Sequence, residues 1–240
     1  MGAWGFYFDQ TRCIGCKTCT VACMAWNESK RGDAALHPED DIPVNPAYEI
    51  PAGYETMPDG GFNREEMSKY HMKEELIRVT ETEYGRGMPD VDVLYLALSC
   101  GHCERPACAA VCPRGCIYKD AETGAVLSDN RRCEGCSLCR EACPYRAPQF
   151  YKEPGKALPG ETAPMVKCDL CIERIRAGLK PACVAACRVR ALDALPPEMM
   201  KLRHPHASPG AINLPGDISP LTNEHTRPNW LFKPKTPRHR

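Results

Sequence analysis

The chain has 240 residues, a formal net charge of zero and 43% hydrophobic residues, a share that includes 17 cysteines. This length allows one large domain or two small ones, and the remaining apolar residues make a thin core. So many cysteines indicate either disulfides or bound metal, and their spacing separates the two. The N-terminal residues show no secretion signal, twin arginine or myristoylation pattern, and no window is long enough for a membrane span.

Short elements are expected along the chain. Residues 4–9 are predicted to form a strand, and the β-branched or apolar runs at 76–81 and 93–98 are predicted to pair across a turn at 85–89. Four helical turns are expected near the last two cysteines of four motifs, at 18–26, 107–111, 138–142 and 182–186.

Two segments have the composition of irregular structure. Residues 27–75 contain Pro, Gly and Asp without a clear period, and we interpret them as a long acidic surface insertion. Residues 196–240 hold nine prolines, which predicts an extended tail. Part of this tail should dock through Trp230, Leu231 and Phe232. Because such segments gain order by wrapping a neighbour, both are expected to lie on a partner protein.

The cysteines occur in repeated motifs. RCIGCKTCTVAC at 12–23 matches RCEGCSLCREAC at 132–143, and CGHCERPACAAVC at 100–112 resembles CDLCIERIRAGLKPACVAAC at 168–187. CxxCxxC wraps three corners of one [4Fe–4S] cube, and a cysteine on the next helical turn faces away, towards a second cube. Four such motifs predict four clusters. A zinc ribbon binds its ion with two CxxC pairs, so it does not need the third cysteine or the trailing CxxxC. Disulfides are also disfavoured, because adjacent CxxC pairs close few long loops.

The charge distribution is consistent with clusters. Residues 99–190 hold fifteen Lys or Arg against ten Asp or Glu, whereas residues 27–92 hold sixteen acidic against seven basic residues. An excess of cations beside the cysteines offsets the negative charge of thiolate-bound clusters. No basic helix with interleaved aromatic residues accompanies them, so no nucleic-acid partner is expected.

Several segments between the cysteines carry a family resemblance: YLALSCGHCERPACAAVCP, CPYRAPQF, MVKCDLCIERIRAGLKPACVAACRVRALD and TRPNWLFKP. The chain resembles the iron–sulfur (beta, electron-transfer) subunit of the dimethyl sulfoxide reductase family of molybdenum or tungsten oxidoreductases. Met24 and Arg188 depart from the proline that often follows the last cysteine in that family, and the acidic insertion is long.

The resemblance implies that the first motif pairs with the fourth and the second with the third. The implied ligands are, for cluster 1, Cys13, Cys16, Cys19 and Cys187; for cluster 2, Cys168, Cys171, Cys183 and Cys23; for cluster 3, Cys100, Cys103, Cys108 and Cys143; and for cluster 4, Cys133, Cys136, Cys139 and Cys112. Some relatives have Trp at the position of Cys136 and hold a [3Fe–4S] cluster there; the cysteine here implies four cubes.

The implied fold class is α+β, with two bacterial-ferredoxin-like 2[4Fe–4S] modules, one nested in the other. The outer module takes 1–26 plus 164–195 and the inner one 93–150. The acidic insertion, ending in a strand, takes 27–92, and the proline-rich tail takes 196–240.

The resemblance implies a non-catalytic electron-transfer subunit, with a molybdopterin catalytic subunit as partner and a membrane anchor subunit as an optional one. The alternatives are a companion subunit of a soluble molybdenum or tungsten hydroxylase, dehydroxylase or transhydroxylase, and an electron-transfer subunit of a hydrogenase or formate dehydrogenase. We expect a cytoplasmic protein, unless it is exported folded with a signal-bearing partner or held at the membrane by an anchor. No nucleotide loop, zinc-protease motif or nucleophile–base pair points to catalysis.

A few residues outside the ligand sets have alternative interpretations. Cys116 belongs to no motif, and we interpret it as a small buried residue near a cluster rather than a redox-active thiol. His102 is interpreted as structural or as tuning a cluster from outside its ligand shell. Four basic residues near ligands either raise local potentials or are solvated: Lys17, Arg105, Arg146 and Lys167.

Overall fold

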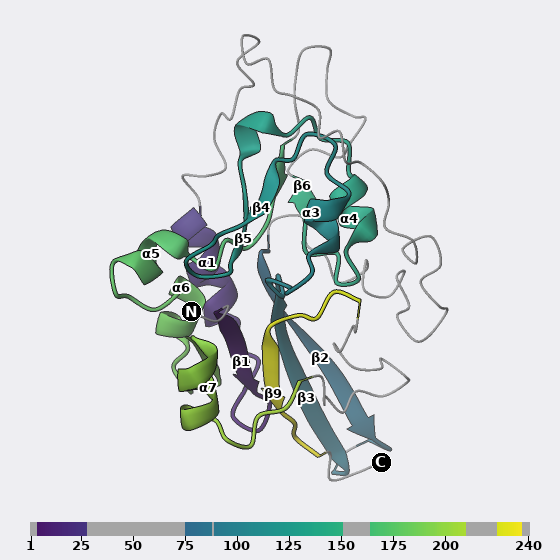
Figure 1. Ribbon diagram of the computed structural model, residues 1–240. Helices are drawn as coiled ribbons and strands as arrows, with labels where there is room; N and C mark the ends of the chain where they lie inside the picture. The colour runs from purple at the N-terminus through teal and green to yellow at the C-terminus, as the bar shows by residue number, and fades with distance from the viewer. Residues whose placement is uncertain (1–3, 28–74, 88, 151–163, 210–224, 237–240) are drawn as a thin grey trace.

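The structure, a computed structural model, describes residues 4–27, 75–87, 89–150, 164–209 and 225–236 (Figure 1). Short helices and small β-sheets alternate along these ranges, in agreement with the predicted mixed α and β content. The predicted insertion at 27–75 falls almost wholly outside the described residues.

A three-stranded sheet brings the two ends of the described chain together. Its central strand is β1 (Gly5–Asp9), which pairs antiparallel with β8 (Leu192–Leu195) and parallel with β9 (Trp230–Lys233). The ring of Phe6 stacks on that of Trp230, with 4.9 Å between the ring centroids. Aromatic pairs on neighbouring strands stabilise such a sheet. The predicted strand at 4–9 is therefore confirmed.

A long hairpin leads into the second cysteine motif. Strands β2 (Ile77–Gly85) and β3 (Val91–Ser99) pair antiparallel, with Ile77 opposite Ser99 and Gly85 opposite Val91. The predicted pairing and its turn are confirmed. The apolar residues of β3 become continuously buried towards its end, directly before Cys100.

The four predicted helices are present at the cysteine motifs. They are α1 (Thr18–Asn27), α3 (Ala107–Ala110), α4 (Leu138–Ala142) and α6 (Ala182–Ala186). Helix α1 packs against α6, and α3 packs against α4. The helix of the first motif thus lies beside that of the fourth, and the helix of the second beside that of the third (Figure 1).

The sequence did not predict several very short elements. They are the hairpin strands β4 (Ile117–Lys119) and β5 (Val126–Ser128), the paired strands β6 (Gln149–Phe150) and β7 (Met165–Val166), the 3₁₀ turn η2 (Asn130–Arg132), and α5 (Ile172–Arg176). Two or three residues are too few to show a hydrophobic period.

The tail departs from its predicted form in two ways. Residues Pro197–Arg203 form helix α7, where we expected extended structure. Pro196 is its N-cap and Pro197 its first residue, positions at which a missing amide hydrogen and a fixed φ do no harm. Trp230 and Phe232 are 3% and 1% exposed against the protein's own β1, so their docking is confirmed but they are not available to a partner.

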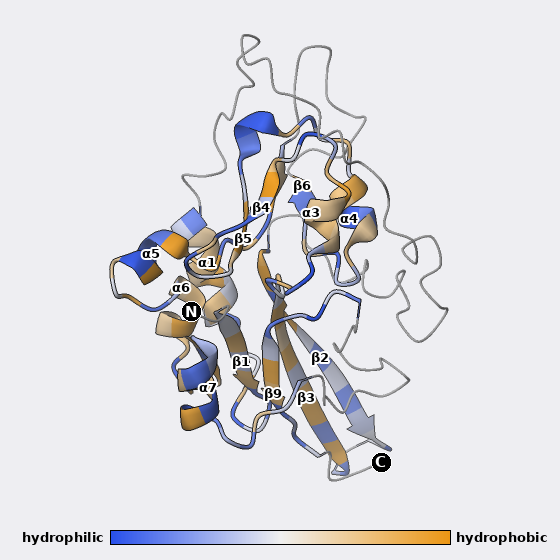
Figure 2. Cartoon of the chain, in the orientation of Figure 1, coloured by the Kyte–Doolittle hydropathy of each residue, from blue (hydrophilic) through white to orange (hydrophobic). Residues whose placement is uncertain are grey.

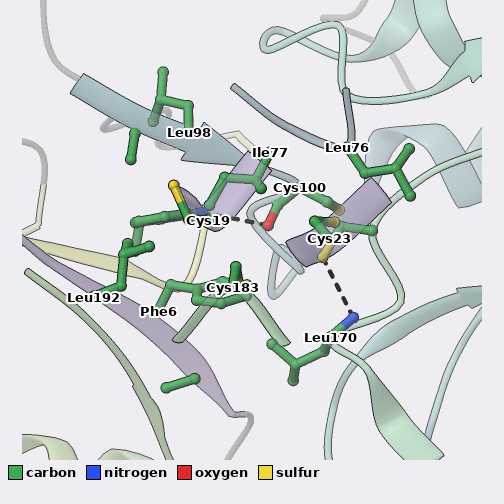
Figure 3. Packing of buried hydrophobic residues seen from close by; sticks show 14 of the residues in the cluster. Phe6, Cys19, Cys23, Leu76, Ile77, Leu98, Cys100, Leu170, Cys183 and Leu192 are labelled. Carbon is green, nitrogen blue, oxygen red and sulfur yellow. Dashed lines mark hydrogen bonds between the residues drawn. The ribbon is translucent and has the colours of Figure 1, made fainter. Parts of the chain in front are cut away.

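The core contains thiols as well as hydrocarbon. In the largest buried cluster, Cys19, Cys23, Cys100 and Cys183 lie among aromatic and aliphatic side chains such as Phe6 (Figure 3). Hydrophobic residues concentrate on β1, β3 and β9, whereas helix α7 mixes both kinds (Figure 2). Among the helices of the described ranges, none has the length and apolar character to cross a membrane.

Candidate metal centres

The repeated CxxCxxC sequences fold into repeated loops. Gly15 and Gly135 have φ of 69° and 74°, and two positions later Lys17 and Ser137 have φ of 56° and 64°. These left-handed residues turn the backbone back on itself between successive cysteines, and glycine adopts this conformation at little cost. A Cβ atom at Gly15 would also overlap the ring of Tyr95. Left-handed residues at the same two positions therefore give both loops the same curvature around their three thiols.

Four thiols gather where the first and fourth motifs meet. Burial, and then the neighbouring thiolates of Cys13 and Cys187, raise the pKa of Cys19 to about 11. Burial likewise raises the pKa of Cys13, to which Cys187 and Cys16 contribute. The structure therefore brings together the four cysteines expected for cluster 1.

A second group lies next to it and draws on the same two motifs. Burial, and then the thiolate of Cys171, raise the pKa of Cys23 to about 12. The pKa values of Cys168 and Cys183 are raised well above the usual range by burial and then by Cys23 and Cys171. These are the four cysteines expected for cluster 2. Cys19 and Cys23 lie one turn apart on the buried side of α1, so one helix reaches both groups.

The third group joins the second and third motifs. Burial, and then the thiolates of Cys100 and Cys143, raise the pKa of Cys103 to about 12. Burial also raises the pKa of Cys108 well above its usual range, and Cys143 and Cys100 reinforce this effect. These four thiols are the ones expected for cluster 3.

The fourth group surrounds a small cavity. Its lining includes Cys112, Cys133, Cys136 and Cys139, the set expected for cluster 4. Burial raises the pKa of Cys139, and the thiolates of the other three raise it further.

At least one thiol pair links each group to the next. The thiolate of Cys19 raises the pKa of Cys183, that of Cys100 raises the pKa of Cys168, and that of Cys143 raises the pKa of Cys139, each in addition to burial. The four groups therefore follow one another in the order 1, 2, 3, 4. Among the cysteines, Cys16 in group 1 and Cys136 in group 4 are exposed.

Backbone amides donate to several of these sulfurs. They include Met165 to Cys133 at 3.3 Å, Leu170 to Cys168 at 3.4 Å, Ala147 to Cys143 at 3.5 Å and Ala191 to Cys187 at 3.2 Å. Such hydrogen bonds stabilise a thiolate and adjust the reduction potential of a bound cluster. In the described ranges, no three His, Cys, Asp or Glu side chains surround a single metal ion. That geometry concerns one ion; the thiolates of a cube each bind a different iron and lie further apart.

His102 offers a further test of whether these residues suit a cluster. Its ring is 1% exposed and its Nδ1 accepts a hydrogen bond from the amide of Val126 at 3.0 Å. Burial, then Lys167 and Lys119, hold the pKa of His102 well below its usual range, so the ring is neutral and Nε2 carries the proton. Nε2 has no hydrogen-bond partner among the described residues. A cube held by the adjacent Cys100 and Cys103 would offer sulfide acceptors, so the residues fit such a group.

Lys167 is a buried cation between groups 2 and 3. It is 5% exposed, and its ammonium donates to the carbonyl oxygens of Val126 and Cys168. Although burial lowers the pKa of Lys167, the thiolates of Cys100, Cys108 and Cys168 raise it more. Of the four basic residues noted in the sequence, Lys167 thus has the surroundings needed to influence two clusters at once.

The tail covers the loop of the second motif, a contact that the sequence did not predict. Trp230 Nε1 donates to the carbonyl oxygen of Cys100 at 3.3 Å, and Asn229 Nδ2 donates to that of His102 at 2.7 Å. The amide of Arg105 donates to the carbonyl oxygen of Thr226 at 3.0 Å. The sequence signal was the short apolar run after the prolines, which indicated docking but not the docking site.

Cys116 is buried, as the sequence predicted, but it lies inside the group-4 cavity. Its sulfur is 3.1 Å from that of Cys112. The hydrogen bond from Cys116 lowers the pKa of Cys112, and one from Cys116 also lowers the pKa of Cys133. Five thiols, not four, therefore surround this centre.

Comparison with known proteins identifies the family. Two profiles, each described as a 4Fe-4S dicluster domain, match residues 12–116 and 91–195. The B subunit of the anaerobic dimethyl sulfoxide reductase of Escherichia coli is 35% identical over 96% of this sequence and 88% of the relative. The protein belongs to the iron–sulfur subunits of molybdoenzymes.

The beta subunits of two other oxidoreductases are also similar. The beta subunit of the dimethylsulfide dehydrogenase of Rhodovulum sulfidophilum is 32% identical over 79% of this sequence and 66% of the relative. The beta subunit of the perchlorate reductase of Dechloromonas aromatica is 30% identical over 77% of this sequence and 62% of the relative. The iron–sulfur subunit described here is accordingly a non-catalytic electron-transfer subunit with two ferredoxin-like dicluster domains, as the sequence predicted.

Proposed function

We propose that the protein binds four [4Fe–4S] clusters through the sixteen cysteines of the four groups and relays single electrons between a molybdopterin catalytic subunit and a membrane or soluble redox partner. The observation that carries this proposal is the grouping itself. Each proposed set combines three cysteines of one motif with one of another, and the support is that its thiols act on one another's pKa or line one cavity.

The proposed modules are nested as the ligand sets require. Support comes from the packing of α1 on α6 and of β1 on β8, which unites 1–26 with 164–195. The packing of α3 on α4 unites the inner segment, 93–150. The acidic insertion, 27–92, and the tail, 196–240, are additions to this pair of modules.

The groups would act as a relay because they adjoin one another in a single order. Clusters of this kind supply one-electron chemistry when bound, with potentials set by net charge, hydrogen bonds and exposure. The protein contributes amide donors and the buried Lys167, and it buries all four thiols of group 2 as well as Cys100 and Cys108 of group 3. The exposed Cys16 and Cys136 mark the two ends at which redox partners would approach.

The relatives support the type of partner. Their names place them as B or beta subunits of a dimethyl sulfoxide reductase, a dimethylsulfide dehydrogenase and a perchlorate reductase. By analogy, this subunit would serve a molybdopterin subunit, with a membrane anchor as an optional third component.

Iron and acid-labile sulfide analysis of the anaerobically purified complex tests the proposal. Four cubes hold sixteen irons, so about sixteen irons and sixteen sulfides are expected per subunit, after subtraction of any iron in the catalytic partner. A value of twelve or fewer would contradict the four-cluster assignment.

A further inference from the structure

The turn after the trailing cysteine has the same form in three motifs. The third residue after it is left-handed: Gly115, Arg146 and Arg190 have φ of 56°, 46° and 53°. This conformation directs the amide of the next residue back to the cysteine sulfur, as Ala147 and Ala191 show at 3.5 and 3.2 Å.

The residue that donates this amide also places its side chain near the sulfur. Ala147 and Ala191 are 8% and 1% exposed, and each presents only a methyl group. In the second motif the equivalent residue is Cys116, 3% exposed, whose amide likewise donates to Cys112. Cys116 therefore carries a thiol on its Cβ atom, whereas the Cβ atoms of Ala147 and Ala191 are methyl groups.

The thiol of Cys116 contacts two expected ligands of cluster 4. Its sulfur lies 3.1 Å from that of Cys112, and it also hydrogen-bonds the thiol of Cys133. Cys136 and Cys139 complete the lining of the same cavity. A cube has four irons to be ligated, so one of these five thiols is in excess.

We propose that Cys112 and Cys116 are interchangeable ligands of one iron of cluster 4, the unbound sulfur donating its S–H to the bound one. This inference rests on the ligand set proposed above. In the exchange, a Cys116–iron bond would form as the Cys112–iron bond broke, and one proton would move from the Cys116 sulfur to the Cys112 sulfur across their contact. No oxidation state changes, and no external base is needed.

The test compares Cys112→Ala with Cys112→Ala/Cys116→Ala in the full-length protein, purified anaerobically with its catalytic partner. The single variant should keep the wild-type iron content and the cluster-4 spin-resonance signal, whereas the double variant should lose both that signal and about four irons. Cys143→Ala is the matched control: it removes the equivalent ligand of cluster 3, where the neighbour is Ala147, and should lose that cluster. Loss of cluster 4 in Cys112→Ala to the extent seen in the double variant would overturn the proposal.

Two further variants keep the inference falsifiable if Cys112→Ala does not accumulate. Ala147→Cys should restore cluster 3 to Cys143→Ala, and failure to do so would contradict the positional argument. Cys116→Ala should shift the midpoint potential of cluster 4 to a more negative value by removing an S–H donor, and an unchanged potential would contradict the contact. A wild-type protein with fewer than four clusters would instead overturn the proposed function.

Discussion

The indole nitrogen of Trp230 donates a hydrogen bond to the carbonyl oxygen of Cys100, with 3.3 Å between the two atoms. The two residues are 130 positions apart in the sequence. Trp230 is also stacked on Phe6 and Phe232, at 4.9 and 5.5 Å between ring centroids. One tail residue thus fastens the first strand, the last strand and the loop of the second motif together.

Trp230→Ala should destabilise the cluster-loaded subunit by about 3–5 kcal/mol, the usual cost of truncating a buried Trp. Trp230→Phe keeps much of the stacking but removes the indole donor of the Cys100 carbonyl, which keeps the longer bond from Ser99 Oγ at 3.5 Å, and should cost about 1 kcal/mol. Urea denaturation, followed by the visible absorbance of the clusters, ranks the stabilities of the variants. If unfolding is irreversible, the unfolding rates are compared instead of the denaturation midpoints. Leu202→Ala, at a residue that is 76% exposed, is the control. Equal effects of the two Trp230 variants would contradict the division between packing and hydrogen bonding.

Lys167→Met should lower the potentials of clusters 2 and 3 together. A unit charge at close range and an effective dielectric constant of about 20 contributes about 2 kcal/mol, or roughly 50–100 mV for a one-electron couple. Redox titration followed by spin resonance measures the change. Clusters 1 and 4 should keep their potentials, as should all four in Lys180→Met, which removes an exposed cation that pairs with Asp193. A shift confined to one cluster would show that Lys167 does not act on both groups.

Cys136→Trp or Cys136→Ser should convert or destroy cluster 4 and no other cluster. The reason is that Cys136 lines the group-4 cavity with Cys112, Cys133 and Cys139. Spin resonance of the reduced variant identifies the altered signal. Cys116→Ser serves as the control and should leave all four signals in place. If the signal of the Cys13 cluster changed instead, the pairing of the motifs would be wrong.

The iron-free protein should not fold. Several thiols, among them Cys19, Cys23 and Cys183, are part of the main buried cluster, and without iron they would line empty centres instead of holding them together. Circular dichroism and proton–nitrogen NMR of the apoprotein measure this directly. A collapsed NMR spectrum that becomes dispersed on reconstitution is the expected result; a well-dispersed spectrum before reconstitution would count against it.

The sequence predicted the local structure well where chemistry restricts it. The CxxCxxC loops and the four short helices follow from cysteine spacing, and the β2–β3 hairpin follows from two apolar or β-branched runs, one of them directly before Ser99. The predictions failed for elements that are too short to show a pattern and for one helix that depends on where its prolines lie. Strands of two or three residues carry no period, and helix α7 forms because its prolines stand at the N-cap and first position.

By itself, the sequence determined that this protein binds iron–sulfur clusters, because two-residue spacings confine three thiols to one loop whatever the rest of the fold does. The pairing of distant motifs came from family resemblance rather than from spacing. Only the tertiary structure decided that β9 lies on β1, that Lys167 sits between two groups, and that Cys116 enters the fourth centre. These contacts join residues far apart in the sequence or depend on where one turn directs a single side chain, and such packing leaves no periodic mark in the sequence.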